Sequence, residues 1–302
     1  MRSPVRIAVP RKGRPLEAVL DRLAAVSDFA AVADEVISTL RYEKAVAKGT
    51  QSPDRPVYER LVDYSDVSDP TRPEFTMLRD DRDGKPRRIV FDAVSLHVDG
   101  VPVELVGREE PFRALRTHAF TLGFDSADLV LEEVVSLEPE PLENIAGLNE
   151  RIDPHDTDVR VVTGLDDTVY HSLLATPGVI DDGPTRTLDR SFVEGYEGPF
   201  RISPRYERLV EAILGTDAAA GLEFEYPDPG EQEESAIART GIGVYLTETG
   251  GTARDAGLIV GERLFPSETV LLENVEESEG DAVDTVKSSL SSGVRSATNP
   301  AV

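Results

Sequence analysis

The turn at residues 248–252 is the part of this sequence best suited to hold a ligand. It consists of Glu248, Thr249, Gly250, Gly251 and Thr252. An apolar, strand-like segment (241–246) precedes it, and the pattern after it predicts a helix over 252–264. The glycine pair allows backbone N–H groups to converge, and the start of the helix adds partial positive charge. The turn is a candidate phosphate-binding site, although such a turn can also join a strand to a helix without any ligand.

A basic turn near the N-terminus has the same position between a strand and a helix. Residues 5–9 form a short apolar segment that stops at Pro10, and apolar residues recur at helical spacing from Leu16. The turn contains Lys12, Gly13 and Arg14, and Lys12 is one of only five lysines in the chain. Ligands collect at the carboxyl ends of parallel strands, so both turns could face one cleft. Solvent-facing charges beside a helix start are the alternative interpretation.

The sequence assigns neither catalytic residues nor metal ligands. The four histidines, at positions 97, 118, 155 and 171, lack the spacing of a metal site, and we expect them to be solvated or at the edge of the core. Neither a Ser/His/Asp set nor a nucleophile elbow can be assembled from spacing. The pair Glu132–Glu133 lies on a predicted helix, where a solvated face is the simplest interpretation.

Composition limits the class of protein. The chain has 302 residues, no cysteine and a formal net charge of -25, from 57 acidic and 32 basic residues. The acids are spread along the chain, and only five of the 32 bases are lysines. Both features are typical of proteins that work in concentrated salt, because the salt screens the repulsion between carboxylates. A broad nucleic-acid-binding face needs clustered bases and is not expected. We found no signal peptide and no membrane-spanning apolar segment, so the expected location is the cytoplasm.

The order of elements predicts an α/β fold. Strand-like and helix-like segments alternate with short links, which favours mainly parallel sheets. A hairpin is predicted around Asp99–Gly100, and helices over 112–121, 206–214 and 282–291. Residues 49–87 are rich in Pro, Asp, Ser and Arg and are predicted to form a long inserted loop.

Taken in order, several segments resemble ATP phosphoribosyltransferase, the first enzyme of histidine biosynthesis. The opening residues 7–17 look like that family's first strand and its Pro-Lys-Gly-Arg turn. The most specific match is 249–258, which resembles the family's Thr-Gly-x-Thr-Leu-x-x-Asn-Gly-Leu phosphate loop. Weaker matches lie at 106–111, 122–128, 200–206 and 271–274.

The resemblance implies a fold with two lobes, similar to type 2 periplasmic binding proteins. The lobe boundaries that we predict are 1–158 with 264–290 for lobe 1 and 159–263 for lobe 2, with a flexible tail at 291–302. The resemblance also implies an interlobe cleft for phosphoribosyl diphosphate and a nucleotide or other base acceptor. In that cleft residues 248–252 would hold the 5′-phosphate, and Lys12, Gly13, Arg14 and Arg108 would contact diphosphate or nucleotide phosphates. Mg²⁺ is implied as well, since it accompanies the diphosphate in that family.

One departure from the family leaves alternatives open. The family carries Asp-Ala-x-Val-Asp before its phosphate loop, and this chain has Gly241 and Tyr245 at the two acidic positions. The first interpretation is a phosphoribosyltransferase-like enzyme in which Glu248 substitutes in part. The second is a non-catalytic regulatory module that binds a small phosphorylated anion on the same fold, and the third is an unrelated α/β protein. The sequence does not fix the oligomeric state, and a homo-oligomer is one alternative.

Overall fold

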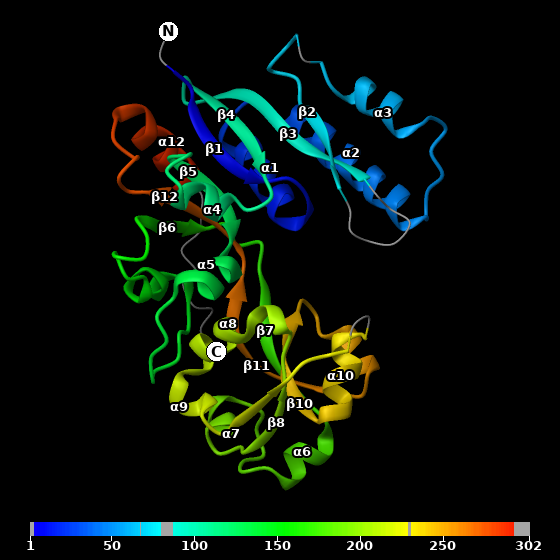
Figure 1. Ribbon diagram of the computed structural model, residues 1–302, viewed down its shortest axis with the longest axis vertical. Helices are drawn as coiled ribbons and strands as arrows, with labels where there is room; N and C mark the ends of the chain where they lie inside the picture. Colours follow the sequence, from blue (N-terminus) through cyan, green and yellow to red (C-terminus); the bar gives the residue numbers. More distant parts are fainter. Residues whose placement is uncertain (1–2, 67, 80–86, 229–230, 293–302) are drawn as a thin grey trace. The chain divides into compact units, whose positions relative to one another are not determined.

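The chain forms two compact units in the computed structural model, which describes residues 3–66, 68–79, 87–228 and 231–292 (Figure 1). Unit 1 comprises the described residues up to Asp125, residues Asp158–Asp167, and those from Thr269 onward. Unit 2 comprises Ser126–Thr157 and Thr168–Glu268. The α/β class and the division into two parts are therefore confirmed.

Unit 1 is built on a sheet that has seven strands within the described residues. In spatial order they are β2 (Glu74–Arg79), β3 (Arg87–Val98), β4 (Val101–Arg108), β1 (Val5–Pro10), β5 (Leu122–Ser126), β12 (Thr269–Asn274) and β6 (Val159–Gly164). The predicted hairpin is confirmed, because β3 and β4 pair antiparallel around Asp99–Gly100. The central strand β1 pairs in parallel with both β4 and β5.

Helices cover both faces of this sheet. The helices of unit 1 are α1 (Gly13–Val26), α2 (Ala30–Lys48), α3 (Val57–Tyr64), α4 (Pro111–Arg116) and α12 (Asp281–Ser291). Ile7 and Val9 of β1 belong to the apolar core that α1, α2 and α12 share, whereas Ala8 faces Leu115 of α4. This alternation is the period of two that a strand imposes on its side chains. On α1, Leu16 is fully buried, which contributes about 1.5–3 kcal/mol of apolar transfer free energy.

The segment predicted as a loop at 49–87 contains regular structure. Its described residues include α3 and β2, and β2 extends the sheet by pairing antiparallel with β3. The prediction failed because α3 has only eight residues, too few for its helical period to stand out within a stretch rich in Pro, Asp, Ser and Arg. A buried ion pair between Arg60 and Glu43 of α2, with N–O distances of 2.8 and 2.9 Å, helps to fix α3, whose Val57 and Leu61 also pack on the core.

Unit 2 contains a sheet of five strands within the described residues. In spatial order they are β11 (Ile259–Ser267), β7 (Val169–Ala175), β10 (Ile242–Thr247), β8 (Gly198–Arg201) and β9 (Leu222–Glu225). Its α-helices are α5 (Ala127–Val134), α6 (Pro177–Asp182), α7 (Arg190–Glu194), α8 (Glu207–Leu214), α9 (Thr216–Ala219), α10 (Glu233–Thr240) and α11 (Gly251–Asp255). Two 3-10 helices, η1 (Ile145–Arg151) and η2 (Pro204–Tyr206), complete it.

The sheets are mixed, which corrects the expectation of mainly parallel strands. Parallel pairs such as β1–β4 and β8–β10 lie beside antiparallel pairs such as β6–β12 and β7–β11. The reason is that β6 continues into β7 and β11 continues into β12 with short links. A chain that runs from one unit to the other and then returns must run antiparallel to itself, and the alternation of strands and helices does not reveal this.

The unit boundaries also differ from the predicted lobes. Residues 126–157, expected in lobe 1, belong to unit 2, where α5 packs against α8. Residues 159–167, expected in lobe 2, belong to unit 1 because β6 pairs with β12. Of the predicted flexible tail, 293–302 lies outside the described residues, and Ser291 ends α12.

No helix among the described residues is long and apolar enough to cross a membrane.

Candidate functional site

The turn after β10 has a backbone that requires glycine. Gly250 has φ +70°, in the left-handed region that other residues rarely adopt, and a Cβ there would lie 2.8 Å from Cγ2 of Val260. Arg254 closes the turn by donating from Nη2 to the carbonyl oxygen of Thr249 at 2.7 Å. The side chains of Thr249 and Thr252 are exposed. The turn thus presents two threonine hydroxyls to solvent, while Gly250 is buried and Gly251 is partly exposed.

The helix that follows this turn is much shorter than predicted. Instead of a helix over 252–264, α11 ends at Asp255 and β11 begins at Ile259. Gly257, which has φ +78°, ends the helical stretch, and the apolar residues beyond it pack as a strand against β7. The dipole of a five-residue helix is small, so an anion here would depend mainly on N–H groups and hydroxyls of the turn.

The basic turn of unit 1 lies at the carboxyl end of β1, as predicted. Pro10 pairs in parallel with Arg108 at the end of β4, so the structure brings Lys12, Gly13 and Arg108 to one edge of the sheet. Lys12 Nζ is 3.4 Å from Oε2 of Glu109, the residue after β4. The guanidinium of Arg108 lies 4.9 Å from the ring centroid of Phe120.

Arg14 has a structural partner at the same edge. Its Nη1 lies 3.0 Å from Oδ2 of Asp167, the last residue of the 158–167 segment of unit 1. The same carboxylate accepts hydrogen bonds from the backbone N and the hydroxyl of Thr269, at 2.7 and 2.8 Å. Arg14 therefore helps to fix the chain where it leaves and re-enters unit 1, and a ligand phosphate would compete with Asp167 for it.

Arg11 has a structural role that sequence reasoning missed. Its side chain is only 15% exposed, and it pairs with Asp92 of β3 at 3.2 Å. It also donates from Nε to the carbonyl oxygen of Gly107 at 3.0 Å. A Cβ on Gly107 would lie 2.6 Å from the carbonyl oxygen of Phe91 and 3.0 Å from Cγ of Arg11. Arg11 is the scaffold of the basic turn, and only the glycine before Arg108 hinted at this close packing.

The two positions where the family carries acids have structural roles here. Gly241 follows α10 with φ +111° and its N–H donates to Ile237 O at 2.7 Å, closing the helix. Tyr245 is partly buried, and burial together with the nearby Glu234 and Glu233 raises the pKa of its hydroxyl. A tyrosine with a raised pKa stays protonated at neutral pH, so it supplies a hydrogen-bond donor where a carboxylate would supply an acceptor.

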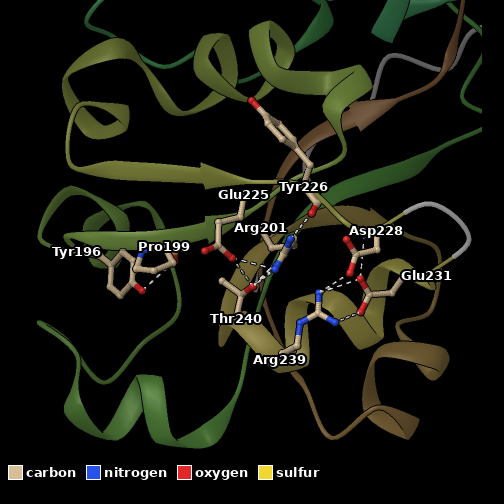
Figure 2. A network of polar contacts seen from close by, with 9 residues as sticks. All are labelled: Tyr196, Pro199, Arg201, Glu225, Tyr226, Asp228, Glu231, Arg239 and Thr240. Atoms are coloured by element: carbon tan, nitrogen blue, oxygen red, sulfur yellow. Dashed lines mark hydrogen bonds and ion pairs between the residues drawn. The ribbon is translucent and has the colours of Figure 1, made fainter.

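Arg201 explains why glycine is needed within β10. Its guanidinium lies beside β9 and α10, where it donates to Thr240 Oγ1 at 2.6 and 2.9 Å and to Glu225 Oε2 at 2.9 Å (Figure 2). The residue is only 6% exposed. Because β8 and β10 approach closely here, a Cβ on Gly243 would lie 2.2 Å from the carbonyl oxygen of Arg201. These contacts fix β10, the strand that leads into the turn at 248–252, which we call the phosphate turn after its predicted ligand.

Two other predictions about polar residues in unit 2 are corrected. His171 is buried, with Nε2 3.1 Å from Oδ1 of Asp128, whose Oδ2 accepts from the hydroxyl of Ser267 at 2.8 Å. Glu132 does not lie on a solvated face, because it accepts from the backbone N of Leu209 at 3.0 Å, and burial raises its pKa. Both side chains satisfy polar groups inside unit 2, and neither role follows from their spacing in the sequence.

The described residues do not form a cation site by themselves. No group of three or more His, Cys, Asp or Glu among them is placed to hold a metal ion. Glu248 is exposed and is the carboxylate that the phosphate turn itself contains. A Mg²⁺ ion would thus have to take most of its oxygen ligands from a bound diphosphate and from water, which is its common coordination beside phosphates.

The two parts of the predicted site belong to different units. Lys12, Gly13, Arg14 and Arg108 are together at one edge of unit 1, and residues 248–252 form a single turn of unit 2. The interlobe cleft itself stays an expectation.

Comparison with solved structures finds distant likenesses. The ATP phosphoribosyltransferase (HisG:HisZ) complex of Thermotoga maritima is 13% identical over 95% of this chain and 96% of that chain, with a TM-score of 0.42. YhfZ of Shigella flexneri is 12% identical over 98% and 93% of the two chains, with a TM-score of 0.38. The periplasmic VFT2 domain of Bordetella pertussis BvgS is 13% identical over 64% and 72%, with a TM-score of 0.32. No curated protein sequence matches.

A family comparison covers almost the whole sequence. The model of the halobacterial ATP phosphoribosyltransferase family matches residues 1–300. This match spans both units, including the turns at 10–14 and 248–252. It confirms the resemblance from which a two-lobed fold like type 2 periplasmic binding proteins was expected. The chain belongs to the halobacterial ATP phosphoribosyltransferase family.

Proposed function

We propose that this protein is a phosphoribosyltransferase that transfers the phosphoribosyl group of phosphoribosyl diphosphate to a nucleotide, with ATP as the acceptor that the family description names. The observation that carries the proposal is the family match over residues 1–300. The turn at 249–252 supports it, since both threonines are exposed and the space beside Gly251 is open.

The reaction needs little acid–base chemistry from the protein. A nitrogen of the acceptor bonds to C1 of the ribose while the bond from C1 to the diphosphate oxygen breaks, so negative charge collects on the departing diphosphate. Fixed cations aimed at that charge lower the barrier, and holding the two substrates in line removes much of the entropic cost. Lys12 and Arg108 are the cations that we assign to this role. Within the described residues no carboxylate lies within 4 Å of the Arg108 guanidinium.

The phosphate turn would fix the other end of the donor. Thr249 and Thr252 would donate their hydroxyls to the 5′-phosphate, and Gly251 leaves the backbone open to close approach. Glu248 would offer a carboxylate to a Mg²⁺ that the diphosphate brings with it. The location that we propose for the protein is the cytoplasm of an organism with a salt-rich interior.

A second candidate function is a regulatory module that binds the same ligand without catalysis. It is favoured by Gly241 and Tyr245, which replace the acids of the family pattern. A tyrosine carries no charge at neutral pH, so position 245 lacks the negative charge that a carboxylate would supply.

One assay separates the two candidates. The purified protein is incubated in molar KCl with phosphoribosyl diphosphate, ATP and Mg²⁺, and phosphoribosyl-ATP and diphosphate are measured together. We expect equal amounts of both products, and a loss of at least tenfold in rate for Thr249→Ala. Thr187→Ala, an exposed threonine elsewhere in unit 2, is the matched control and should keep the full rate. Binding of phosphoribosyl diphosphate without product would favour the regulatory module.

A further inference from the structure

A basic pocket in unit 1 begins at Lys12 and Gly13 of the basic turn and extends from there along α2. It has a volume of about 380 Å³ and lies between the start of α1, the second half of α2 and the start of β3. Its cationic lining residues are Lys12, Arg41, Lys44, Lys48 and Arg88. Three of the five lysines of a chain with net charge -25 therefore line one pocket. An acidic coat explains the rest of the surface but not this concentration of lysine.

The two carboxylates that also line the pocket are already paired. Glu43 is buried and bound through both oxygens to Arg60 of α3, at 2.8 and 2.9 Å. Glu17 of α1 binds Arg41 at 2.7 Å. By contrast, among the residues that the structure describes, no carboxylate lies within 4 Å of the ammonium group of Lys44 or Lys48. The pocket thus has positive charge that the protein itself does not neutralise.

Helical spacing places these cations on one face of α2. Arg41, Lys44 and Lys48 are separated by three and four residues, which sets their Cβ atoms about 5–6 Å apart from one to the next. Leu40 and Ala47 share this face and add an apolar floor. A cation in the last turn of a helix is favoured by the helix dipole, and this accounts for Lys48. It does not account for Lys44, which lies one turn earlier.

We propose that this pocket binds a condensed phosphate chain. The chain would be either the di- or triphosphate group of a nucleotide or inorganic polyphosphate. Successive lysines along α2 match the repeated charges of a phosphate chain, and each can give a charge-assisted hydrogen bond. In molar salt the screening length is about 3 Å, so only direct contacts of this kind retain strength. The proposal goes beyond the proposed function, because it depends on Lys44 and Lys48 of α2, to which that function assigns no role.

The test uses inorganic triphosphate as the probe and the full-length protein in molar KCl. Calorimetry compares the wild type with the double variant Lys44→Gln/Lys48→Gln. The matched control is Arg6→Gln/Arg72→Gln, which removes the same charge from two exposed residues of unit 1 outside the pocket. Lys44→Arg/Lys48→Arg keeps the charge. We expect saturable binding to the wild type, to the control and to the arginine variant, and at least tenfold weaker binding to the glutamine variant.

Several results would overturn the proposal. They are the absence of saturable triphosphate binding, equal binding by the glutamine variant, and binding that is instead lost in Gly251→Ala, which would place the ligand at the phosphate turn. A parallel titration with ATP separates the two sources of the phosphate chain. Tighter binding of ATP than of triphosphate, again lost in the glutamine variant, would show that the nucleoside uses the apolar floor. The proposed transferase function is tested separately, by the reaction rate of Thr249→Ala.

Discussion

At the scale of single residues, glycines decide how closely backbone and ligand can approach the proposed site. Gly250 sets the left-handed bend of the phosphate turn, and Gly107 makes room for Arg11 under the basic turn. Gly251 differs from both, because a Cβ there would lie 3.7 Å from Oγ1 of Thr249, an ordinary contact. A substitution at Gly251 therefore changes the surface offered to a ligand without straining the fold, whereas one at Gly250 strains the fold itself.

We predict that Gly250→Ala lowers the free energy of unfolding by about 1–3 kcal/mol, because alanine must adopt a positive φ and its Cβ meets Val260. Urea denaturation in molar KCl measures the change. Gly178→Ala is the control, since a Cβ at Gly178 meets nothing within 4 Å and φ there is not positive. Equal stability of the two variants would show that the turn does not have the described backbone.

A second residue-scale prediction concerns Tyr64 of α3. Burial, and then a hydrogen bond to Glu43, raises the pKa of its hydroxyl to about 12. The neutral phenol is thus favoured in the folded protein, and its contribution is complete below the unfolded pKa of about 10 and is lost as pH rises through the folded value. Tyr64→Phe should cost about 1 kcal/mol at neutral pH.

The same pair of proteins tests the pH dependence. The difference in unfolding free energy between wild type and Tyr64→Phe should be constant up to about pH 10 and shrink above it. Tyr58, which is 57% exposed, provides the control variant Tyr58→Phe. A difference that grows with pH above this value would contradict the assigned direction of the shift.

At the scale of elements, the helix pair α2–α3 shows how a buried polar contact helps to position a short helix. Arg60 and Glu43 are 7% and 6% exposed and bind each other through two hydrogen bonds. Breaking such a buried pair from one side leaves an uncompensated charge. The inserted segment is thus fixed to α2, the helix that carries the lysines of the basic pocket.

We predict that Arg60→Met destabilises the protein by about 3–5 kcal/mol, since Glu43 would stay buried and unpaired. The double variant Arg60→Met/Glu43→Leu should recover part of that loss. Arg72→Met, which breaks an exposed pair with Glu35, should cost at most about 1 kcal/mol. Thermal and urea unfolding measure all three. A double variant no more stable than Arg60→Met would argue against a paired buried charge.

Elements with a strong apolar period could be predicted from the sequence, and the others could not. The β3–β4 hairpin, α8 and α12 follow from alternation or helical spacing. The long helix expected after the phosphate turn is wrong because residues 259–264 carry apolar positions that a strand uses equally well. Unit boundaries were misplaced because pairing of β6 with β12 is a contact between distant segments, and no local pattern encodes it.

For the site, residue types and turn positions were predictable, and partners were not. The basic turn lies at the carboxyl end of β1 beside Arg108, as the parallel-strand rule requires. The engagement of Arg14 by Asp167, across 153 positions, and the scaffold role of Arg11 depend on long-range packing. A sequence pattern shows where cations occur, and only the fold shows which of them are already neutralised.

At the scale of the whole molecule, a net charge of -25 makes stability depend on salt. The screening length falls from about 10 Å at 0.1 M salt to about 3 Å at 1 M, which weakens repulsion between carboxylates that share the surface. We predict that the melting temperature rises steadily with KCl from 0.1 M to above 1 M. Differential scanning calorimetry measures it, with sucrose at matched osmolality as control. A flat or falling melting temperature would contradict the interpretation of the acidic composition as a salt adaptation.

The proposed function requires that the turn at 249–252 holds the 5′-phosphate of phosphoribosyl diphosphate. Calorimetric titration of that ligand in molar KCl with Mg²⁺ tests it most directly, on the wild type, Gly251→Ala and the control Gly178→Ala. We expect saturable binding to the wild type and the control, and binding at least tenfold weaker in Gly251→Ala at unchanged melting temperature. No saturable binding at millimolar ligand, or equal affinity in Gly251→Ala, would contradict it.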